Sequence, residues 1–229
     1  MKTLLVLVIF LLMSCANMSQ PKVQNLIDPN LSQFINIYDH GSARIVGDTL
    51  ELSSTKNWFL VTKKTYKNFV LEGEILMPDV KEYSNSGFMF RGRAKPKGNG
   101  FEAEGLQAEV DPSKRKWSGG LYHQAGRKWL HPIHPKRSEL DEDFKHNFLP
   151  EWTEEMANAY KHLQWNKYRI EAIGSDVKVF VNNVMTSHIT DTKHAEGFIG
   201  LQHHGSKKLA KTGETDNKVY FRNLMITEL

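Results

Sequence analysis

The chain has 229 residues, a formal net charge of +4 and a single cysteine. This length suits one large domain or two small ones, and one cysteine excludes an internal disulfide bond. Lysines and arginines are spread among acidic residues without forming a basic stripe, which disfavours nucleic acid as a partner. Because the sequence contains no internal repeat and no low-complexity linker, we predict one domain.

The start of the chain has the pattern of an export signal. Lys2 precedes an apolar run over residues 4–13 that is too short to span a bilayer as a mature helix. The run ends in LMSC, which resembles the lipobox of bacterial lipoproteins, where the cysteine becomes lipidated. We therefore expect a lipoprotein signal peptide over residues 1–14 and a tether over residues 15–30 that is lipidated at Cys15.

This pattern predicts a location in the bacterial cell envelope. A lipid on Cys15 would anchor the protein to a membrane, and no aspartate follows the cysteine to signal retention in the inner membrane. We therefore expect the outer membrane, with the domain facing the periplasm. The alternative is an ordinary cleaved signal peptide with a cysteine at this position by chance.

Residues 31–229 contain many short segments rich in β-branched and aromatic residues, separated by turn residues. Such a succession is typical of an all-β antiparallel sandwich or jelly roll. The predicted strands begin, in chain order, at Thr49, Trp58, Asn68, Gly87, Gly105, Gly119, Lys167, Asp176, Gly197 and Val219.

Two tight turns and one long excursion divide these strands. The Gly-Ser-Asp segment at residues 174–176 and the Asn pair at residues 182–183 accept the positive φ of tight reversals, which predicts hairpins there. The excursion over residues 126–164 contains Trp152 and Tyr160 at helical spacing and predicts a helix near its end. We expect the apolar stripe of this helix to pack on the sandwich, with a partner-binding face as the alternative.

Several predicted strands combine an apolar face with a short polar row. Gln107, Glu109 and Asp111 alternate with apolar residues, and Gln202 and His204 alternate with Leu and His on a later strand. Amide and imidazole groups reach sugar hydroxyls, and nearby glycines allow a sugar ring to approach the sheet. The pattern favours a carbohydrate-binding face, and a merely solvated face is the alternative.

Two further strands carry candidate binding residues. In SNSGFMFRGR, Arg91 falls on the face opposite Phe88 and Phe90, beside glycines, which favours contact with a ligand. In GGLYHQ the direction stays open, so that either Tyr122 or His123 belongs to the polar face.

The segments NSGFMFRGR, GLQAEVD, GGLYHQ, WNKYRIEAIGSDVKVFVNN, GFIGLQHHG and VYFRNLMI share their order and spacing with one known family. Over residues 36–229 the chain resembles the 3-keto-disaccharide hydrolase domain family. The resemblance implies a concanavalin A-like jelly roll, here with one inserted helix-containing excursion. It also implies an extracytoplasmic hydrolase or lyase that acts on 3-keto-glycosides.

The implied substrate sets the chemistry that the site needs. A ketone at sugar carbon 3 acidifies the proton on carbon 2, so a base can remove it, and the enolate can expel the aglycone from carbon 1 before water adds back. We expect Glu109 or a histidine as the base, and Arg91 or a bound cation to stabilise the enolate oxygen. His204, His123 or Tyr122 would protonate the leaving group. The principal catalytic candidates are Arg91, Glu109 and His204.

The remaining candidates bind substrate or metal. A divalent cation could be held by Glu109, Asp111 and His123, although the sequence has no helix-borne metal motif. Structural roles are the alternative for some of these residues, since Glu109 could simply pair with Arg91 and His203 could pack within its strand. The expected substrate-binding residues are Gln107, Tyr122, His123, Gln202 and Trp129.

Two other functions remain open at this point. A non-catalytic carbohydrate-binding lipoprotein would use Trp117, Trp129 and Tyr122 as stacking platforms. A conventional sandwich-fold glycosidase would need two carboxylates about 5–5.5 Å apart. The carboxylates available for that role lack a compact Glu-x-Asp-x-Glu pattern; they are Glu102, Glu104, Glu109 and Asp111.

Overall fold

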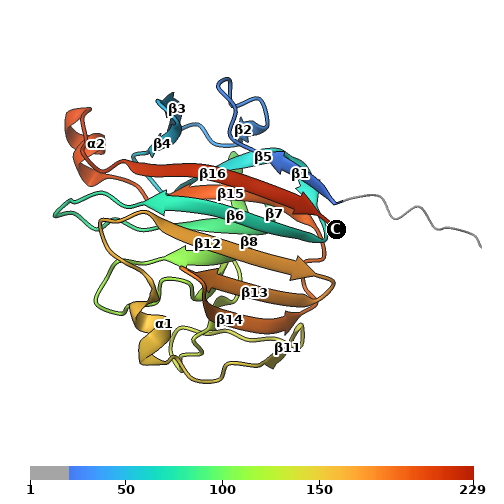
Figure 1. Ribbon diagram of the computed structural model, residues 1–229. Coiled ribbons are helices and arrows are strands. Elements are labelled where there is room, and N and C mark those ends of the chain that lie inside the picture. The colour runs from blue at the N-terminus through green and yellow to red at the C-terminus, as the bar shows by residue number, and fades with distance from the viewer. Residues whose placement is uncertain (1–20) are drawn as a thin grey trace, which may run out of the picture.

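The computed structural model describes residues 21–229, whose strands form a nine-stranded and a seven-stranded antiparallel sheet packed face to face (Figure 1). The nine-stranded sheet contains, in spatial order, β11 (Phe144–Asn147), β14 (Val184–Asp191), β13 (Asp176–Val181), β12 (Asn166–Ile173), β6 (Phe69–Leu76), β16 (Val219–Glu228), β4 (Thr49–Ser53) and β3 (Ser42–Val46), with β1 (Lys22–Asn25) also paired to β16. The seven-stranded sheet contains β10 (Lys128–His131), β9 (Leu121–Gln124), β8 (Gly100–Val110), β7 (Ser86–Lys97), β15 (Gly197–His203), β5 (Trp58–Tyr66) and β2 (Phe34–Asn36). The predicted all-β jelly-roll sandwich is confirmed.

The core lies between the two sheets and follows the predicted alternation. On β8, Leu106, Ala108 and Val110 are fully buried in the core, while Gln107 and Glu109 point to the outer face of the seven-stranded sheet. Burying one large aliphatic side chain contributes roughly 1.5–3 kcal/mol relative to exposing it. The apolar positions therefore determine which face of β8 is left for function.

The predicted hairpin turns are present. Gly174, Asn182 and Asn183 all have positive φ values, of 56°, 48° and 70°. The first turn joins β12 to β13, and the asparagine pair joins β13 to β14, which the sequence patterns did not predict as a strand. Glycine and asparagine tolerate this backbone conformation better than other residues, so the turn chemistry fixes these reversals.

The predicted helix in the 126–164 excursion is shorter than expected. Helix α1 (Glu154–Ala159) begins after Thr153, whose side chain accepts from the backbone N–H of Met156, and it ends at Tyr160. The side chain of Asn166 then bonds the backbone groups of the next segment, accepting from Lys161 N and donating to its carbonyl oxygen. These bonds replace those of a continued helix. A second short helix, α2 (Lys207–Thr212), was not predicted.

The folded domain begins earlier than residue 31. Strand β1 pairs with β16, and Leu26 is fully buried in the core, so residues 22–30 belong to the fold and not to the expected tether. The predicted signal peptide and Cys15 lie outside the described residues. Within residues 21–229, no helix is long and apolar enough to cross a bilayer.

Candidate functional site

A row of amide side chains crosses the outer face of the seven-stranded sheet. Gln107 on β8 donates from Nε2 to Oε1 of Gln202 on β15 (2.7 Å), and Gln202 donates to Oδ1 of Asn57 (2.8 Å). A Cβ at position 87 would lie 2.4 Å from Nε2 of Gln107, so Gly87 provides the space for this row. Two predicted substrate-binding residues, Gln107 and Gln202, are therefore neighbours.

Gln107 also presents an unused hydrogen-bond acceptor. The residue is fully buried, and its Oε1 has no hydrogen-bond partner within residues 21–229. Buried polar atoms in folded proteins nearly always have a partner. A sugar hydroxyl is a donor of the kind that this oxygen can accept from.

Glu109 follows two residues later on the same face of β8, opposite Gly87 of β7. Its side chain is buried, and its Oε2 accepts a hydrogen bond of 3.1 Å from Nδ2 of Asn85. Burial raises the pKa of Glu109 to about 8, and the nearby negative charge of Asp111 adds to this shift. Glu109 is therefore a carboxyl group that exchanges its proton near neutral pH.

An arginine that the sequence patterns did not indicate lies beside this carboxyl group. Arg115 donates from Nε (2.9 Å) and Nη2 (2.8 Å) to Oδ2 of Asp111, whose side chain is fully buried. The guanidinium lies 5.6 Å from the ring of Trp117 and 5.7 Å from that of Trp129. Its positive charge acts on Glu109 in the direction that lowers the pKa. Arg115 is thus a held cation close to the candidate base.

Aromatic side chains form one side of the site. Trp129 on β10 lies opposite Tyr122 on β9, with ring centroids 5.4 Å apart, and Trp117 packs against Trp129 at 4.8 Å. Tyr122 in turn lies opposite Gln107 in the pairing of β9 with β8. We call Trp117, Tyr122 and Trp129 the aromatic wall. Burial raises the pKa of the Tyr122 phenol, so it stays protonated at neutral pH.

The two consecutive histidines at the end of β15 have different environments. His203 is buried, donates from Nε2 to the carbonyl oxygen of Asn217 (2.9 Å), and accepts at Nδ1 from the backbone N–H of Gly205. It is a packed strand residue, the structural alternative considered above. His204 is exposed, and its ring meets that of Tyr83 edge-on at 5.1 Å. The backbone N–H of His204 donates to the carbonyl oxygen of Asn85, so this histidine lies at the rim of the site.

Arg91 does not lie with these residues. The pairing of β7 with β8 is irregular between Phe90 and Arg93, and Arg91 itself has a φ of 50°. Its buried side chain donates to three backbone carbonyl oxygens, those of Lys67, Gly174 and His194. The expectation that Arg91 contacts substrate beside Glu109 is therefore wrong, because the irregularity turns its side chain away from the polar face. A pair between Arg91 and Glu109 is excluded for the same reason.

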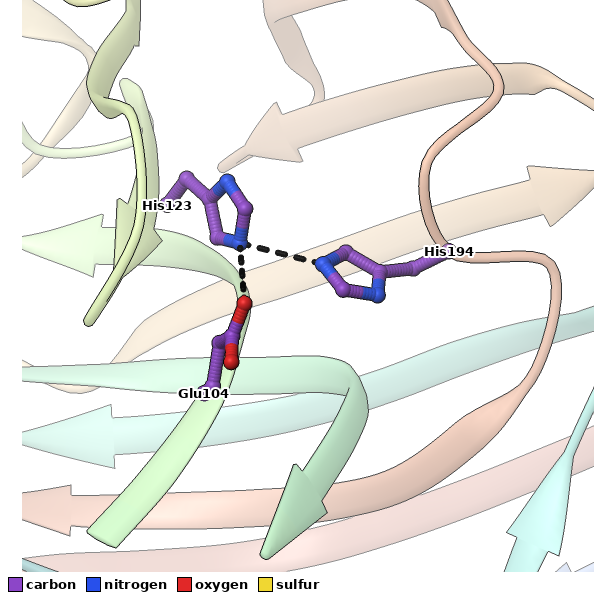
Figure 2. Close-up of side chains that lie close together, drawn as sticks. All are labelled: Glu104, His123 and His194. Carbon is purple, nitrogen blue, oxygen red and sulfur yellow. Dashed lines mark hydrogen bonds and ion pairs between the residues drawn. The ribbon is translucent and has the colours of Figure 1, made fainter. Parts of the chain in front are cut away.

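His123 also points away from the polar face. It shares the core side of β9 with Leu121, and its Nε2 lies 3.0 Å from Nε2 of His194 and 3.7 Å from Oε1 of Glu104 (Figure 2). His123 is thus no substrate-binding residue of the outer face. The expected metal set of Glu109, Asp111 and His123 is not brought together.

The cluster of Glu104, His123 and His194 has ligand atoms within 4.8 Å of one another, but its surroundings do not suit a cation. Arg127 donates from Nε to Nδ1 of His123 (2.9 Å), so the neutral imidazole carries its proton on Nε2. A histidine that binds a metal needs the opposite arrangement, with one nitrogen free for the metal and the other donating. Arg93 also binds both oxygens of Glu104. Burial and the positive charge of Arg127 lower the pKa of His123 to about 3, so the imidazole of His123 is neutral at physiological pH.

Comparison with known proteins agrees with this fold. Residues 22–227 match the 3-keto-alpha-glucoside-1,2-lyase-like domain. The chain belongs to this family. No curated protein sequence matches it.

Solved structures show the same architecture as this lyase-like domain. Two candidate glycosyl hydrolases from Parabacteroides distasonis ATCC 8503 are 18% and 14% identical to it, with TM-scores of 0.56 and 0.54. The first alignment covers 91% of this chain and 100% of the other, and the second covers 90% and 94%. A Bacillus subtilis protein of unknown function with a galectin-like fold is 11% identical, with a TM-score of 0.52 over 84% of this chain and 90% of the other. At these identities the likeness establishes the fold.

The sequence patterns did not indicate two polar site residues of the lyase-like domain, Asn85 and Arg115. Asn85 precedes β7, and Arg115 lies in the loop that follows β8, so neither belongs to an alternating strand segment. The only local signal is the spacing of four between Asp111 and Arg115, which indicates a side-chain pair in a helix but not in a loop.

Proposed function

We propose that the domain cleaves 3-keto-glycosides, with Glu109 as the base that removes the proton from sugar carbon 2. Family membership supports this substrate class. The observation that carries the proposal is the position of Glu109, whose carboxyl group is buried on the polar face of β8 two residues from Gln107. Burial there raises its pKa to about 8. A base works best when its pKa lies near the pH at which the enzyme operates.

The reaction is an elimination followed by hydration. Ionised Glu109 takes the proton from carbon 2, and the electron pair of that bond moves toward the ketone at carbon 3 to form an enolate. The enolate then expels the aglycone oxygen from carbon 1, which takes up a proton, and a double bond forms between carbons 1 and 2. Addition of water to this double bond returns a proton to carbon 2 and places a hydroxyl on carbon 1. A domain that stops before this addition acts as a lyase.

Arg115 takes the role that the sequence had assigned to Arg91. Its two bonds to Asp111 leave further N–H donors of the guanidinium for the enolate oxygen. Because Asp111 and the tryptophans hold the group in place, little reorganisation is needed as negative charge develops. Tyr122 is the proton donor to the leaving group, and the exposed His204 is the second candidate for this step.

The sugar itself is held by the amide row and the aromatic wall. Oε1 of Gln107 accepts from a hydroxyl group, and the ring of the sugar packs against Tyr122 and Trp129. A non-catalytic sugar-binding protein would use the same features and is the second candidate function. The buried, ionisable Glu109 favours catalysis, because burial of a carboxyl group is costly unless it serves a purpose.

A conventional glycosidase is less well supported. Such an enzyme needs two carboxyl groups that face the sugar from either side of the bond. In the part of the chain that the structure describes, Asp111 is the acidic neighbour of Glu109. Asp111 accepts two hydrogen bonds from Arg115, so its carboxylate serves to hold that arginine and does not face the sugar as a second catalytic group. Glu104 points to the other face of the sheet, toward His123.

Purified protein without its signal peptide tests the proposal. We expect release of the aglycone from a 3-keto-glucoside and none from the parent glucoside. Glu109→Gln should lower the turnover number at least about a hundredfold, the usual scale for losing a general base. Asp48→Asn changes an exposed carboxyl group in the turn between β3 and β4, at the edge of the nine-stranded sheet; it is the matched control and should turn over like wild type. Binding of the keto-sugar without cleavage would favour the sugar-binding protein, and cleavage of the parent glucoside would favour the conventional glycosidase.

We also propose that the protein is a lipid-anchored component of the bacterial cell envelope. The support is the apolar run that ends in the lipobox-like LMSC segment before the domain. Such a location would place the site where oxidised glycosides from outside the cell are met first.

A further inference from the structure

A pocket of about 760 Å³ borders the sugar-binding face. The pocket and the face share two walls, the rings of Tyr122 and Trp129. Tyr122 lies directly opposite Gln107 in the strand pairing, so the pocket opens one strand away from the amide row. This volume falls in the range of small-molecule sites. The pocket is therefore placed to receive the part of a substrate that extends beyond the sugar.

The outer side of the pocket is a fixed turn of the 126–164 excursion. The carbonyl oxygen of His134 accepts from the backbone N–H groups of Arg137 and Ser138, both at 3.0 Å. The carbonyl oxygen of Arg137 accepts from Trp129 N (3.1 Å), which ties the turn to β10. The side chains of residues 134–137 are thus presented by a backbone that is bonded to the sheet.

Hydrogen-bond donors predominate among the polar groups that line the pocket. Nδ1 of His134 accepts from the backbone N–H of Lys136 (3.1 Å), so the neutral ring carries its proton on Nε2 and offers a donor. Lys128, Lys136 and Arg137 supply cationic donors, and none of the carboxyl groups in residues 21–229 lines the pocket. Lys128 pairs with the exposed Glu139, whereas Lys136 and Arg137 form no ion pair with a described residue.

This donor excess distinguishes the pocket from a neutral sugar site. Each sugar hydroxyl both donates and accepts, so a neutral sugar needs acceptors such as those of the amide row. An oxyanion only accepts, and charged donors bind it more strongly than neutral ones do. The amide row and the pocket therefore suit different parts of one ligand.

We infer that the pocket binds an oxyanion on the leaving group, so that the preferred substrates are 3-keto-glycosides whose aglycone carries a carboxylate or a sulfonate-like group. The inference rests on the proposed function for the cleavage step, and on the geometry of the turn for the choice of aglycone. It also assigns a role to the 126–164 excursion, which supplies the cations beside the aromatic wall.

Three substrates of similar shape test this preference. They are the 3-keto-glucosides of 4-hydroxybenzoate, 4-hydroxybenzenesulfonate and 4-hydroxybenzamide. The carboxamide group withdraws electrons more strongly than the carboxylate, so leaving-group chemistry alone favours the neutral amide. We expect kcat/KM for the carboxylate to exceed that for the amide at least about tenfold, the effect of one charge-assisted contact. The sulfonate shows whether the pocket recognises oxyanions in general or the carboxylate alone.

The double variant Lys136→Ala/Arg137→Ala separates the pocket from the catalytic site. We expect it to remove most of the carboxylate preference, and we expect added salt to weaken that preference in wild type because exposed charges are screened. Lys145→Ala, an exposed cation of the same excursion that does not line the pocket, should keep the wild-type ratio. An equal ratio in the double variant and wild type would refute the inference.

Binding of the free leaving groups provides a readout without turnover. Because Trp129 lines the pocket, tryptophan fluorescence should report tighter binding of 4-hydroxybenzoate than of 4-hydroxybenzamide, and the double variant should lose this difference. If the difference is present but no keto-glycoside is cleaved, the pocket assignment stands and the proposed function fails. If keto-glycosides are cleaved without a carboxylate preference, the proposed function stands and the pocket assignment fails.

Discussion

Nδ2 of Asn85 donates a hydrogen bond of 3.1 Å to Oε2 of Glu109, from a residue that precedes β7 to one near the end of β8. This bond favours the ionised carboxylate and so acts to lower the pKa of Glu109, against the larger effect of burial, which raises it to about 8. Asn85 therefore sets how much of the base is ready at neutral pH. It is a positioning residue, since it acts through Glu109.

The pH dependence of kcat/KM should show this relationship. The pKa of Glu109 is about 8, so most of its side chains are protonated when the pH is lower than this. Wild-type kcat/KM should therefore rise about tenfold per pH unit as the pH approaches 8 and should level off at higher pH. Asn85→Ala removes a donor that favours the charged form, so the pKa should rise and the curve should move to higher pH. A pH–rate profile of both proteins checks this, and a profile that falls from pH 6 to pH 8 would contradict Glu109 as the base.

Arg115→Met should lower the turnover number of a 3-keto-glucoside at least about a hundredfold, the scale for losing one oxyanion-stabilising donor. The change also leaves the buried carboxylate of Asp111 without its partner, so the melting temperature must be measured with the rate. Arg115→Met/Asp111→Asn removes that unpaired charge. If this double variant is folded and as active as wild type, Arg115 has no part in the chemistry.

Arg91→Met should have the opposite profile. The side chain is buried and satisfies three backbone carbonyl oxygens, so its loss should lower the free energy of unfolding by about 2–4 kcal/mol. The folded fraction should keep a turnover number within a few-fold of wild type, because Arg91 lies away from Glu109. Chemical denaturation and kinetics on the same preparation test this, and a stable but inactive Arg91→Met would restore the catalytic role.

The cluster of Glu104, His123 and His194 should not bind a divalent cation. Arg127 donates to Nδ1 of His123, which leaves the proton on the nitrogen that would face the metal. We expect Zn²⁺ to shift the melting temperature of wild type no more than that of His194→Ala. A ligand present at about a hundred times its dissociation constant would stabilise the folded state by about 2.7 kcal/mol. A Zn²⁺-dependent stabilisation of wild type that His194→Ala abolishes would therefore reverse this conclusion.

Cys15→Ser tests the proposed membrane anchor. The substitution lies before the domain that begins at residue 22, so the fold should be intact and the protein should move from the membrane fraction to the soluble fraction. Fractionation of cells that express each form, followed by immunoblotting, measures this. Membrane association that is unchanged in Cys15→Ser would rule out lipidation at this residue.

The alternation of side chains along single strands was sufficient to predict much of the fold. It separated the core residue Leu106 from Gln107 and Glu109 on β8, and it placed Gln202 on the same outer face. The asparagine turn at residues 182–183 was equally predictable, because positive φ is a local property of the residue type. These features depend only on neighbours in the sequence.

Other features were decided by contacts between distant segments. The irregular pairing at Arg91 reversed the face of that side chain, and only the pairing of β8 with β9 shows that His123 faces the core while Tyr122 faces the site. Arg115 joins the site through a loop, where no periodicity indicates direction. The sequence by itself therefore determined the faces of β8 and β15 and the candidate base. The tertiary structure decided which cation and which aromatic residues accompany that base, because strand register and loop positions result from long-range packing.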